Sequence, residues 1–208
     1  MIAPIVQMSN IGSQLTEALA GLDRTQELMN LTGEDDLENR SIVLDDIQGK
    51  LEFNDVSFAY DDGKNVLHNI NLKVKEGDVI ALVGSSGSGK STIAGLCATF
   101  LTPQTGSVTM DGVDLANVKL ISYRKHLGVV LQDEFLFEGT IRENILFSRP
   151  KATQTQLLTA VKAGYVDEFT DRFEKGLDTL IGERGVKLSG GQRQRIAIAR
   201  AILADPKI

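Results

Sequence analysis

Apolar positions near the N-terminus recur at alternating steps of four and three residues: Ile11, Leu15, Ala18, Leu22 and Met29, with Thr25 interrupting the series. This period predicts an amphipathic helix with one apolar face. The pattern leaves two roles open for that face: packing on the domain that follows, or continuing a helix from upstream. The short apolar opening and the absence of a basic residue before Arg24 indicate neither a secretory signal nor a membrane span.

The apolar pattern stops at Gly33, and the stretch 33–40 is charged and poor in apolar side chains. Such a composition is typical of a solvated linker and a domain boundary. We therefore predict three parts: the helix in 1–32, a linker in 33–48 and a main domain in 49–208.

The front half of the main domain has the apolar patterns of strands. Leu51 and Phe53 alternate with polar neighbours, and Val56 and Phe58 resume the alternation after a slip of one position, which predicts a half-buried antiparallel strand. Three further apolar runs predict strands at 66–74, 79–83 and 127–131, and 107–110 predicts a short one.

The pattern changes to a helical period over 90–101 and again through most of 140–204. Strands ahead of helices indicate an α/β fold, with an antiparallel β flank and a helical lobe.

The composition narrows the function classes. The 208 residues are 42% hydrophobic and 24% charged, with a net charge of -6 and no long stripe of Lys and Arg, so no nucleic-acid partner is expected. The single cysteine, Cys97, cannot form an internal disulfide, which favours a reducing compartment. We expect Cys97 to be a small core residue.

A phosphate-binding motif follows the predicted strand 79–83. Its residues are Gly84, Ser85, Ser86, Gly87, Ser88, Gly89, Lys90, Ser91 and Thr92, which satisfy G-x-x-x-x-G-K-S/T between a strand and a helix. In this motif the backbone N–H groups of the loop and the helix N-terminus meet phosphates, Lys90 reaches the β and γ phosphates, and Ser91 offers a ligand to Mg²⁺. The alternative is a merely flexible glycine turn.

A second motif lies near the C-terminal end and consists of Leu188, Ser189, Gly190, Gly191 and Gln192. Ser189 and Gln192 also fit the capping box that starts a helix, which accounts for the helix but not for the glycines. Bare glycines in the first helical turn allow a phosphate to sit against the positive helix end while Ser189 donates a hydrogen bond.

With both motifs in this order, the stretch 51–208 resembles the nucleotide-binding domain of ABC transporters, whose signature reads LSGGQ. The resemblance implies a P-loop NTPase fold with a mostly parallel core sheet, ATP and Mg²⁺ as cofactors, and hydrolysis of ATP. It also implies that the signature completes the ATP site of a second nucleotide-binding domain arranged head to tail. A transmembrane domain, expected in the same full-length chain, would place the protein at the cytoplasmic face of the cell membrane.

Further positions match this family one by one. Tyr60 is similar to the aromatic residue that stacks on adenine, and Gln132 to the glutamine that reaches Mg²⁺ and the attacking water, although Leu131 stands where proline is common. The stretches 135–137, 140–145 and 182–185 are similar to those of exporters, so the resemblance implies ATP-driven export.

In this family the Asp205-Pro-Lys-Ile208 stretch leads into an apolar strand that ends in the catalytic Asp-Glu pair, and then to a switch histidine. Those residues are not in this sequence, so we expect a fragment that is inactive alone. Two alternatives remain: a soluble ABC-type ATPase of DNA repair or chromosome maintenance, which predicts a long coiled-coil insertion, and a regulatory module that binds nucleotide without hydrolysis.

Overall fold

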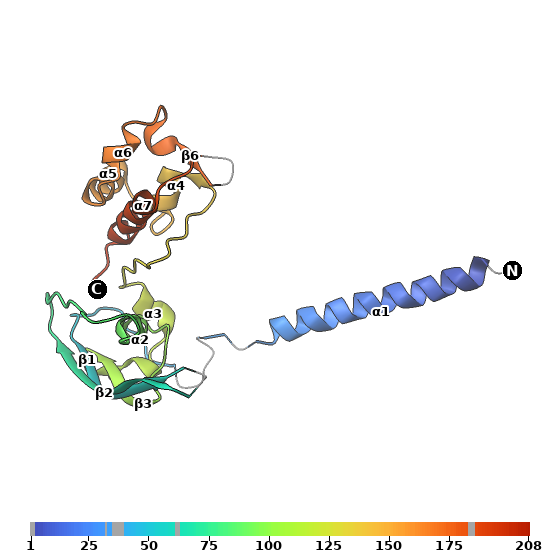
Figure 1. Ribbon diagram of the computed structural model, residues 1–208, viewed down its shortest axis with the longest axis horizontal. Coiled ribbons are helices and arrows are strands. Elements are labelled where there is room, and N and C mark those ends of the chain that lie inside the picture. Colours follow the sequence, from blue (N-terminus) through green and yellow to red (C-terminus); the bar gives the residue numbers. More distant parts are fainter. Residues whose placement is uncertain (1–2, 32, 35–39, 61–62, 183–185) are drawn as a thin grey trace. The chain divides into compact units, whose positions relative to one another are not determined.

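The computed structural model describes residues 3–31, 33–34, 40–60, 63–182 and 186–208. They fall into two units, Met1–Arg40 and Ser41–Ile208. The first unit contains the expected N-terminal helix, α1 (Ala3–Met29), on which the apolar side chains of Ile11, Leu15 and Leu22 are more than half exposed (Figure 1). Among the described helices, none combines the length and the apolar character needed to cross a membrane. The boundaries of the expected linker stay a prediction, and its residues 35–39 lie outside the described ones.

The second unit begins with a four-stranded antiparallel sheet in the order β2-β1-β3-β4. Its strands are β1 (Leu51–Ala59), β2 (Asn65–Val74), β3 (Thr105–Met110) and β4 (Val113–Asp114). The helices that lie beside it are α2 (Lys90–Cys97), the 3-10 turn η1 (Leu115–Asn117) and α3 (Leu120–Arg124) (Figure 1).

The slip that the sequence predicts in the first strand is a β-bulge in β1. The register of β1 against β2 shifts between Phe53 and Val56, and the intervening Asp55 adopts a φ of 49°. The Asp55 backbone N–H donates to the Asn71 side-chain oxygen at 3.0 Å, which satisfies a group that the ladder leaves free. The bulge returns Val56 to the buried face beside Phe53, so the two side chains are 0% and 1% exposed.

The buried face of this sheet and the helices α2 and α3 enclose the first hydrophobic core. Phe53 and Met110 from the sheet pack with Leu96 of α2 and Tyr123 of α3. Each such side chain contributes about 1.5–3 kcal/mol relative to exposure. Because α2 is held against β1 and β2 in this way, its N-terminus has a fixed position beside these strands.

A second core is built around the last helix. The elements are β5 (Gly139–Thr140), α4 (Ile141–Leu146), α5 (Gln154–Ala163), α6 (Asp167–Thr170), η2 (Gly176–Asp178), β6 (Leu180–Ile181) and α7 (Gly190–Leu203). Ile196 and Ala199 of α7 pack on Ile141, Ile145 and other apolar side chains of this group. The expected helical lobe in 140–204 is therefore present.

Two expected strands are not formed. The segments 79–83 and 127–131 make no β-ladder with any described residue, and Val79 and Val83 are 94% and 92% exposed. A strand exists through the hydrogen bonds of its neighbours, and an apolar run without such a neighbour stays irregular. The mostly parallel core sheet is accordingly not found among the described residues, while the α/β class, the antiparallel flank and the helical lobe are.

These two segments border an apolar groove of about 420 Å³. Its lining includes Leu82, Ile93, Cys97, Tyr123 and Val129. Burial raises the pKa of the Cys97 thiol to about 11, so the thiol is protonated near neutral pH. The side chain is only partly buried and packs against the first core rather than within it.

The expected helix over 90–101 is shorter in the structure, because α2 ends at Cys97. Thr99 follows with a φ of 59°, a left-handed conformation that stops the helix. The guanidinium of Arg124 donates to the Thr99 carbonyl at 3.0 Å and holds the turn.

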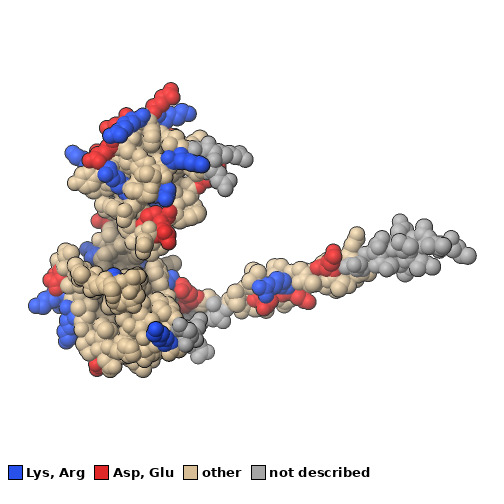
Figure 2. All heavy atoms as spheres, viewed as in Figure 1, with Lys and Arg blue, Asp and Glu red and all other residues tan. Residues whose placement is uncertain are grey.

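Charged side chains of both signs alternate over the face drawn in Figure 2. Acidic residues outnumber basic ones in the chain, 28 to 22.

Candidate functional site

The glycine-rich loop 84–89 leads directly into α2, which begins at Lys90. Gly89 precedes the helix with a φ of 86°, and Gly87 has a φ of 79°, a left-handed region that favours glycine. No side chain caps the N-terminus of α2. Its first-turn N–H groups are therefore available to an anion, and the positive end of the helix dipole lies at the same place.

The core also requires the last glycine of the loop. A Cβ atom added at Gly89 would lie 2.6 Å from Cδ2 of Leu67, whose side chain is 3% exposed. The loop thus passes β2 at a distance that only a residue without a side chain allows.

The ammonium group of Lys90 lies over the loop. Its Nζ donates to the carbonyl oxygens of Gly84 at 3.0 Å and Ser85 at 2.7 Å, and to Oγ of Ser88 at 3.2 Å. The positive charge is thereby centred within the same loop whose backbone N–H groups and helix dipole favour an anion.

Tyr60, at the end of β1, lies against the first turn of α2. Its hydroxyl is 3.2 Å from Oγ1 of Thr92, and its ring packs edge-on against Phe58 with centroids 5.0 Å apart. The side chain remains 47% exposed, so a large part of it is open to a planar ligand. Ser91 is exposed in the same helical turn.

The second motif starts α7, and the capping box that the sequence predicts is present. Oγ of Ser189 accepts from the Gln192 backbone N–H at 3.3 Å, and Oε1 of Gln192 accepts from the Ser189 N–H at 2.8 Å. Because Ser189 acts as an acceptor in this bond, its O–H remains able to donate to a further group. Leu188, just before the cap, is partly buried against the second core.

Gly190 and Gly191 are exposed, and the structure itself does not demand glycine at either position. A Cβ atom at Gly191 would meet nothing within 4 Å, and one at Gly190 would meet only the end of the Arg193 side chain at 3.9 Å. Internal packing therefore gives no reason for glycine at these two positions.

Gln132 lies beside the second motif. It lines a polar cleft of about 540 Å³ together with Glu134, Gly190 and Arg193. The sequence motifs thus form two groups: Tyr60 with 84–92 on the first core, and Gln132 with 188–192 near the second. Among the described residues, no hydrogen bond, ion pair or ring contact given by the structure joins the P-loop to the 188–192 motif.

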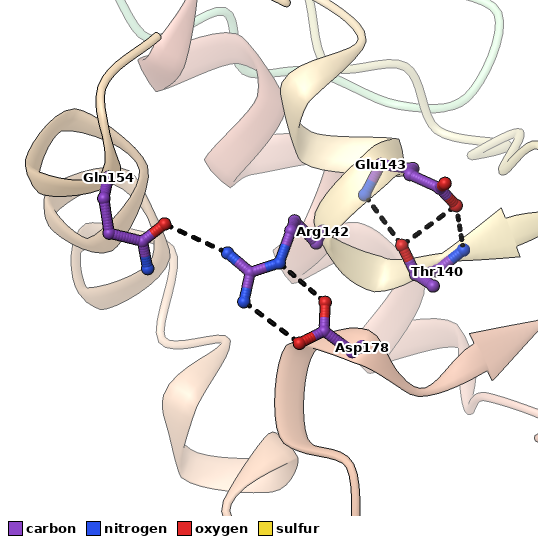
Figure 3. A network of polar contacts seen from close by, with 5 residues as sticks. All are labelled: Thr140, Arg142, Glu143, Gln154 and Asp178. Atoms are coloured by element: carbon purple, nitrogen blue, oxygen red, sulfur yellow. Dashed lines mark hydrogen bonds and ion pairs between the residues drawn. The ribbon is translucent and has the colours of Figure 1, made fainter.

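Polar contacts that the sequence reading did not identify hold the helical group together (Figure 3). The Arg142 guanidinium of α4 binds both carboxylate oxygens of Asp178, at 2.6 and 3.2 Å, and the Gln154 side chain at 3.2 Å. Thr140 and Glu143 form a second capping box at the start of α4. The T-x-x-E spacing could have revealed this box, but no local signal links Arg142 to a partner 36 residues away.

Asp178 precedes β6, which leads through Val186 toward the 188–192 motif. The hydrogen bond from Arg142 is the main cause that lowers the pKa of Asp178 from its usual value. The hydrogen bonds from the Thr140 backbone and hydroxyl likewise lower the pKa of Glu143. Of the exporter-like stretch 182–185, residues 183–185 lie outside the described ones.

Known proteins resemble this chain over its whole length. The family model for ABC transporters matches residues 67–208. The chain is 43% identical, over its whole length, to the ATP-binding/permease protein YgaD of Bacillus subtilis, which is named for multidrug export, and covers 36% of that protein. It is 42% identical over its whole length to an ATP-dependent lipid A-core flippase of Legionella pneumophila, of which it covers 35%.

A solved structure, that of a bacterial Atm1-family ABC exporter with ATP bound, matches 92% of this chain with a TM-score of 0.81 and 37% identity. The chain covers 33% of that protein. The chain thus spans about a third of the length of the relatives that it matches, and its fold is that of an ABC ATPase domain. With the family model matching more than half of its residues, the chain belongs to the ABC transporter family.

Proposed function

We propose that this chain is the ATP-binding and ATP-hydrolysing domain of an ABC exporter, and that ATP-driven association of two such domains drives transport across a membrane. One observation carries the proposal: the P-loop and the signature motif 188–192 belong to different cores of one chain, and both present bare backbone to the outside. Two half-sites that do not meet within a chain are completed by a second copy arranged head to tail.

In this proposal the loop 84–89 and the first turn of α2 hold the phosphates of ATP. Lys90 exchanges its bonds to the loop carbonyls for bonds to the β and γ phosphates. It can do so because its ammonium group is a compact charge at the end of a flexible side chain. The exposed ring of Tyr60, adjacent to Thr92, supplies the surface for adenine.

The donor chemistry also fits Mg²⁺. Ser91 offers a hydroxyl and Gln132 an amide oxygen, the hard ligands that Mg²⁺ accepts together with phosphate oxygens and waters. Because Ser91 belongs to the P-loop group and Gln132 lies beside 188–192, both would reach one Mg²⁺ only after bound nucleotide draws the two groups together. The described residues contain no group of three or more His, Cys, Asp or Glu that would form a separate metal cage. When bound, Mg²⁺ would neutralise charge that develops on the phosphates.

The signature acts on the opposite copy. The free O–H of Ser189 and the bare N–H groups at Gly190 and Gly191 meet the γ-phosphate held by the partner's P-loop, at the positive end of α7. Because one chain supplies only half of each composite site, we expect a single copy of residues 1–208 to bind ATP without sustained turnover until a second copy associates with it.

Two relatives support membrane coupling. The Bacillus subtilis protein is named as an ATP-binding/permease protein and the Legionella pneumophila protein as a flippase, and the chain covers about a third of each. We therefore infer that a transmembrane domain lies in the same full-length protein and that this domain works at the cytoplasmic face of the membrane. ATP hydrolysis alternately closes and opens the domain pair, which moves the membrane part between its two states.

The composite site can be tested by mixing two inactive variants of the full-length protein. Lys90→Ala removes the charge of one half-site, and Gly191→Asp places a carboxylate where the partner's phosphate would lie. Each homodimer should lose ATP turnover by about 10- to 100-fold, since a hydrogen bond to a charged group contributes about 1.5–3 kcal/mol.

Co-expression with two different affinity tags yields the mixed dimer. It retains one site built from an unaltered P-loop and an unaltered signature, so turnover should recover to a measurable fraction of that of the parent. Lys73→Ala, at an exposed lysine of β2, is the control that should change nothing. A mixed dimer as inactive as its parents would overturn the shared site.

A further inference from the structure

The segment 135–137, which follows Gln132 in the sequence, is held by Arg200 of α7. Arg200 donates from Nη1 to the Phe135 carbonyl at 3.2 Å, and from Nε and Nη2 to the backbone and side-chain oxygens of Asn144, each at 3.0 Å. Its guanidinium also lies over the rings of Phe137 and Phe147, 5.8 and 6.0 Å from their centroids. A planar fork is suited to such simultaneous contacts, and a lysine is not.

Asn144 completes the arrangement from α4. Its side chain is almost fully buried, accepts from the Phe137 N–H at 2.9 Å, and donates to the carbonyls of Phe137 at 2.9 Å and Thr140 at 3.0 Å. The segment 135–137 is therefore hydrogen-bonded along its backbone to one buried amide and one guanidinium. We call Arg200 and Asn144 the clamp.

The clamp lies a short distance along the chain from Gln132, since Phe135 is the third residue after it. On the other side of Gln132, the Gly128 N–H donates to the Ile208 carbonyl at 2.8 Å. Two anchors of the Gln132 segment, Arg200 and Ile208, therefore come from α7 or from the few residues that follow it, and a third, Asn144, comes from α4. The same helix carries Ser189 at its start, about 16 Å from Arg200 at the usual rise per residue.

Glu134 and Gln132 line the same cleft beside Gly190. Gln132 and the start of α7 therefore border one cleft, while Arg200 lies toward the other end of the same helix.

We propose that Arg200, with Asn144, is the positioning residue for Gln132: the two side chains fix the backbone of 135–137 and thereby set where the Gln132 amide lies. The inference rests on the proposed role of Gln132 at Mg²⁺. Arg200 does not touch nucleotide or metal and acts through the backbone of 135–137.

The test is a double-variant cycle in the full-length protein with Arg200→Lys, Gln132→Ala and the pair. The concentration of Mg²⁺ that gives half-maximal ATP turnover should shift on the order of 2- to 30-fold in Arg200→Lys, the range of measured coupling effects. In the Gln132→Ala background the same substitution should have almost no further effect, because the residue through which it acts is gone.

Arg195→Lys is the matched control, because Arg195 lies on the same helix and also bonds a backbone carbonyl and an acid, those of Tyr165 and Glu168. Hydrogen–deuterium exchange supplies a readout independent of turnover. Uptake in 132–137 should rise in Arg200→Lys and stay at the parent level in Arg195→Lys, and Arg200→Gln replaces the lysine variant if that one fails to fold.

The outcomes separate the two proposals. Equal Mg²⁺ shifts from Arg200→Lys in both backgrounds, or unchanged exchange in 132–137, would overturn the positioning role while leaving the function of Gln132 intact. If Gln132→Ala alone leaves the Mg²⁺ dependence unchanged, the assignment of Gln132 fails and the positioning role fails with it.

Discussion

Two helices of the proposed ATP site have glycines at their N-termini: Gly89 directly precedes α2, and Gly190 and Gly191 form the start of α7. The structural surroundings of these glycines differ. At α2, Gly89 has a left-handed backbone, would place a Cβ atom 2.6 Å from the Leu67 side chain, and leaves the helix without a side-chain cap. At α7, Ser189 and Gln192 cap the helix fully, and Gly191 lies in open space.

This difference distinguishes a glycine that the fold requires from one that the fold does not require. Gly89 is required by the core that carries it, so its presence alone says little about ligands. Gly191 lowers the stability of its own helix, because glycine is less favourable than alanine in a helix, and no internal contact compensates. A residue that weakens the fold without a packing reason is best explained by what approaches from outside.

The largest expected effect is a loss of stability at Gly89, and it tests whether the core requires a glycine there. Gly89→Ala should lower the free energy of unfolding by about 2–5 kcal/mol, from about 1–2 for the left-handed backbone and about 1–3 for overpacking against Leu67. Gly87→Ala is the matched variant, because it has a φ of 79° but nothing within 4 Å of the added Cβ atom.

Urea unfolding of both variants measures the two costs. Gly87→Ala should lose only the backbone part, about 1–2 kcal/mol. Equal losses at the two glycines would show that the approach of the loop to β2 is not what selects Gly89.

How much of this could be foreseen from the sequence depends on how local each signal is. The bulge in β1, the capping box at Ser189 and the loop into α2 are each encoded within a few residues, and the structure contains all three. The runs 79–83 and 127–131 have equally clear apolar patterns, yet no described strand pairs with them. A strand depends on partners distant in sequence, which an apolar pattern does not specify.

The residues of the candidate site also differ in whether a short-range sequence pattern could reveal them. The P-loop and signature residues were predicted from motif and spacing, and their roles in binding stay predictions. The Arg200 clamp joins residues 56 and 65 positions apart, and no short-range pattern marks Arg200 among the arginines of α7. Long-range polar contacts of this kind become visible only once the helices are packed.

A smaller effect is expected at Gly191, and it tests whether this glycine is kept for a ligand at the expense of helix stability. Gly191→Ala should raise the free energy of unfolding by up to about 1 kcal/mol, because alanine is the better helix former and the added Cβ atom meets no neighbour. The same variant in the full-length protein should lose part of its ATP turnover, since the methyl group occupies the approach of the partner's phosphate.

Gly21→Ala is the control for this stabilisation. Gly21 lies within α1 and also has nothing within 4 Å of an added Cβ atom, so the substitution should stabilise its helix without changing ATP turnover. Full turnover in Gly191→Ala would contradict the view that the bare backbone of α7 is kept for a ligand.

The smallest expected effect is on stability and concerns the Arg142–Asp178 pair, which lies ahead of β6 on the chain segment that leads to 188–192. Because the hydrogen bond from Arg142 lowers the pKa of Asp178 in the folded protein, the charged form of this carboxyl is stabilised by folding. Its contribution is fully present above the unfolded pKa of about 3.9 and is lost as the pH falls toward the lowered folded value. Asp178→Asn removes that contribution at neutral pH and leaves less to lose in acid.

The urea midpoints of parent and Asp178→Asn should therefore differ most near pH 7 and converge below about pH 4, where the unfolded carboxyl takes up its proton. Because Asp178 is exposed, solvent screens the pair and the difference at pH 7 should be small and should decrease with added salt. Asp171→Asn, at an exposed aspartate before η2, gives the reference curve without the Arg142 contact. A difference between parent and Asp178→Asn that persists unchanged at pH 3 would mean that Asp178 supports this region through packing or neutral hydrogen bonds. The ion pair with Arg142 would then contribute no stability, and the approach to α7 would not depend on the charge of Asp178.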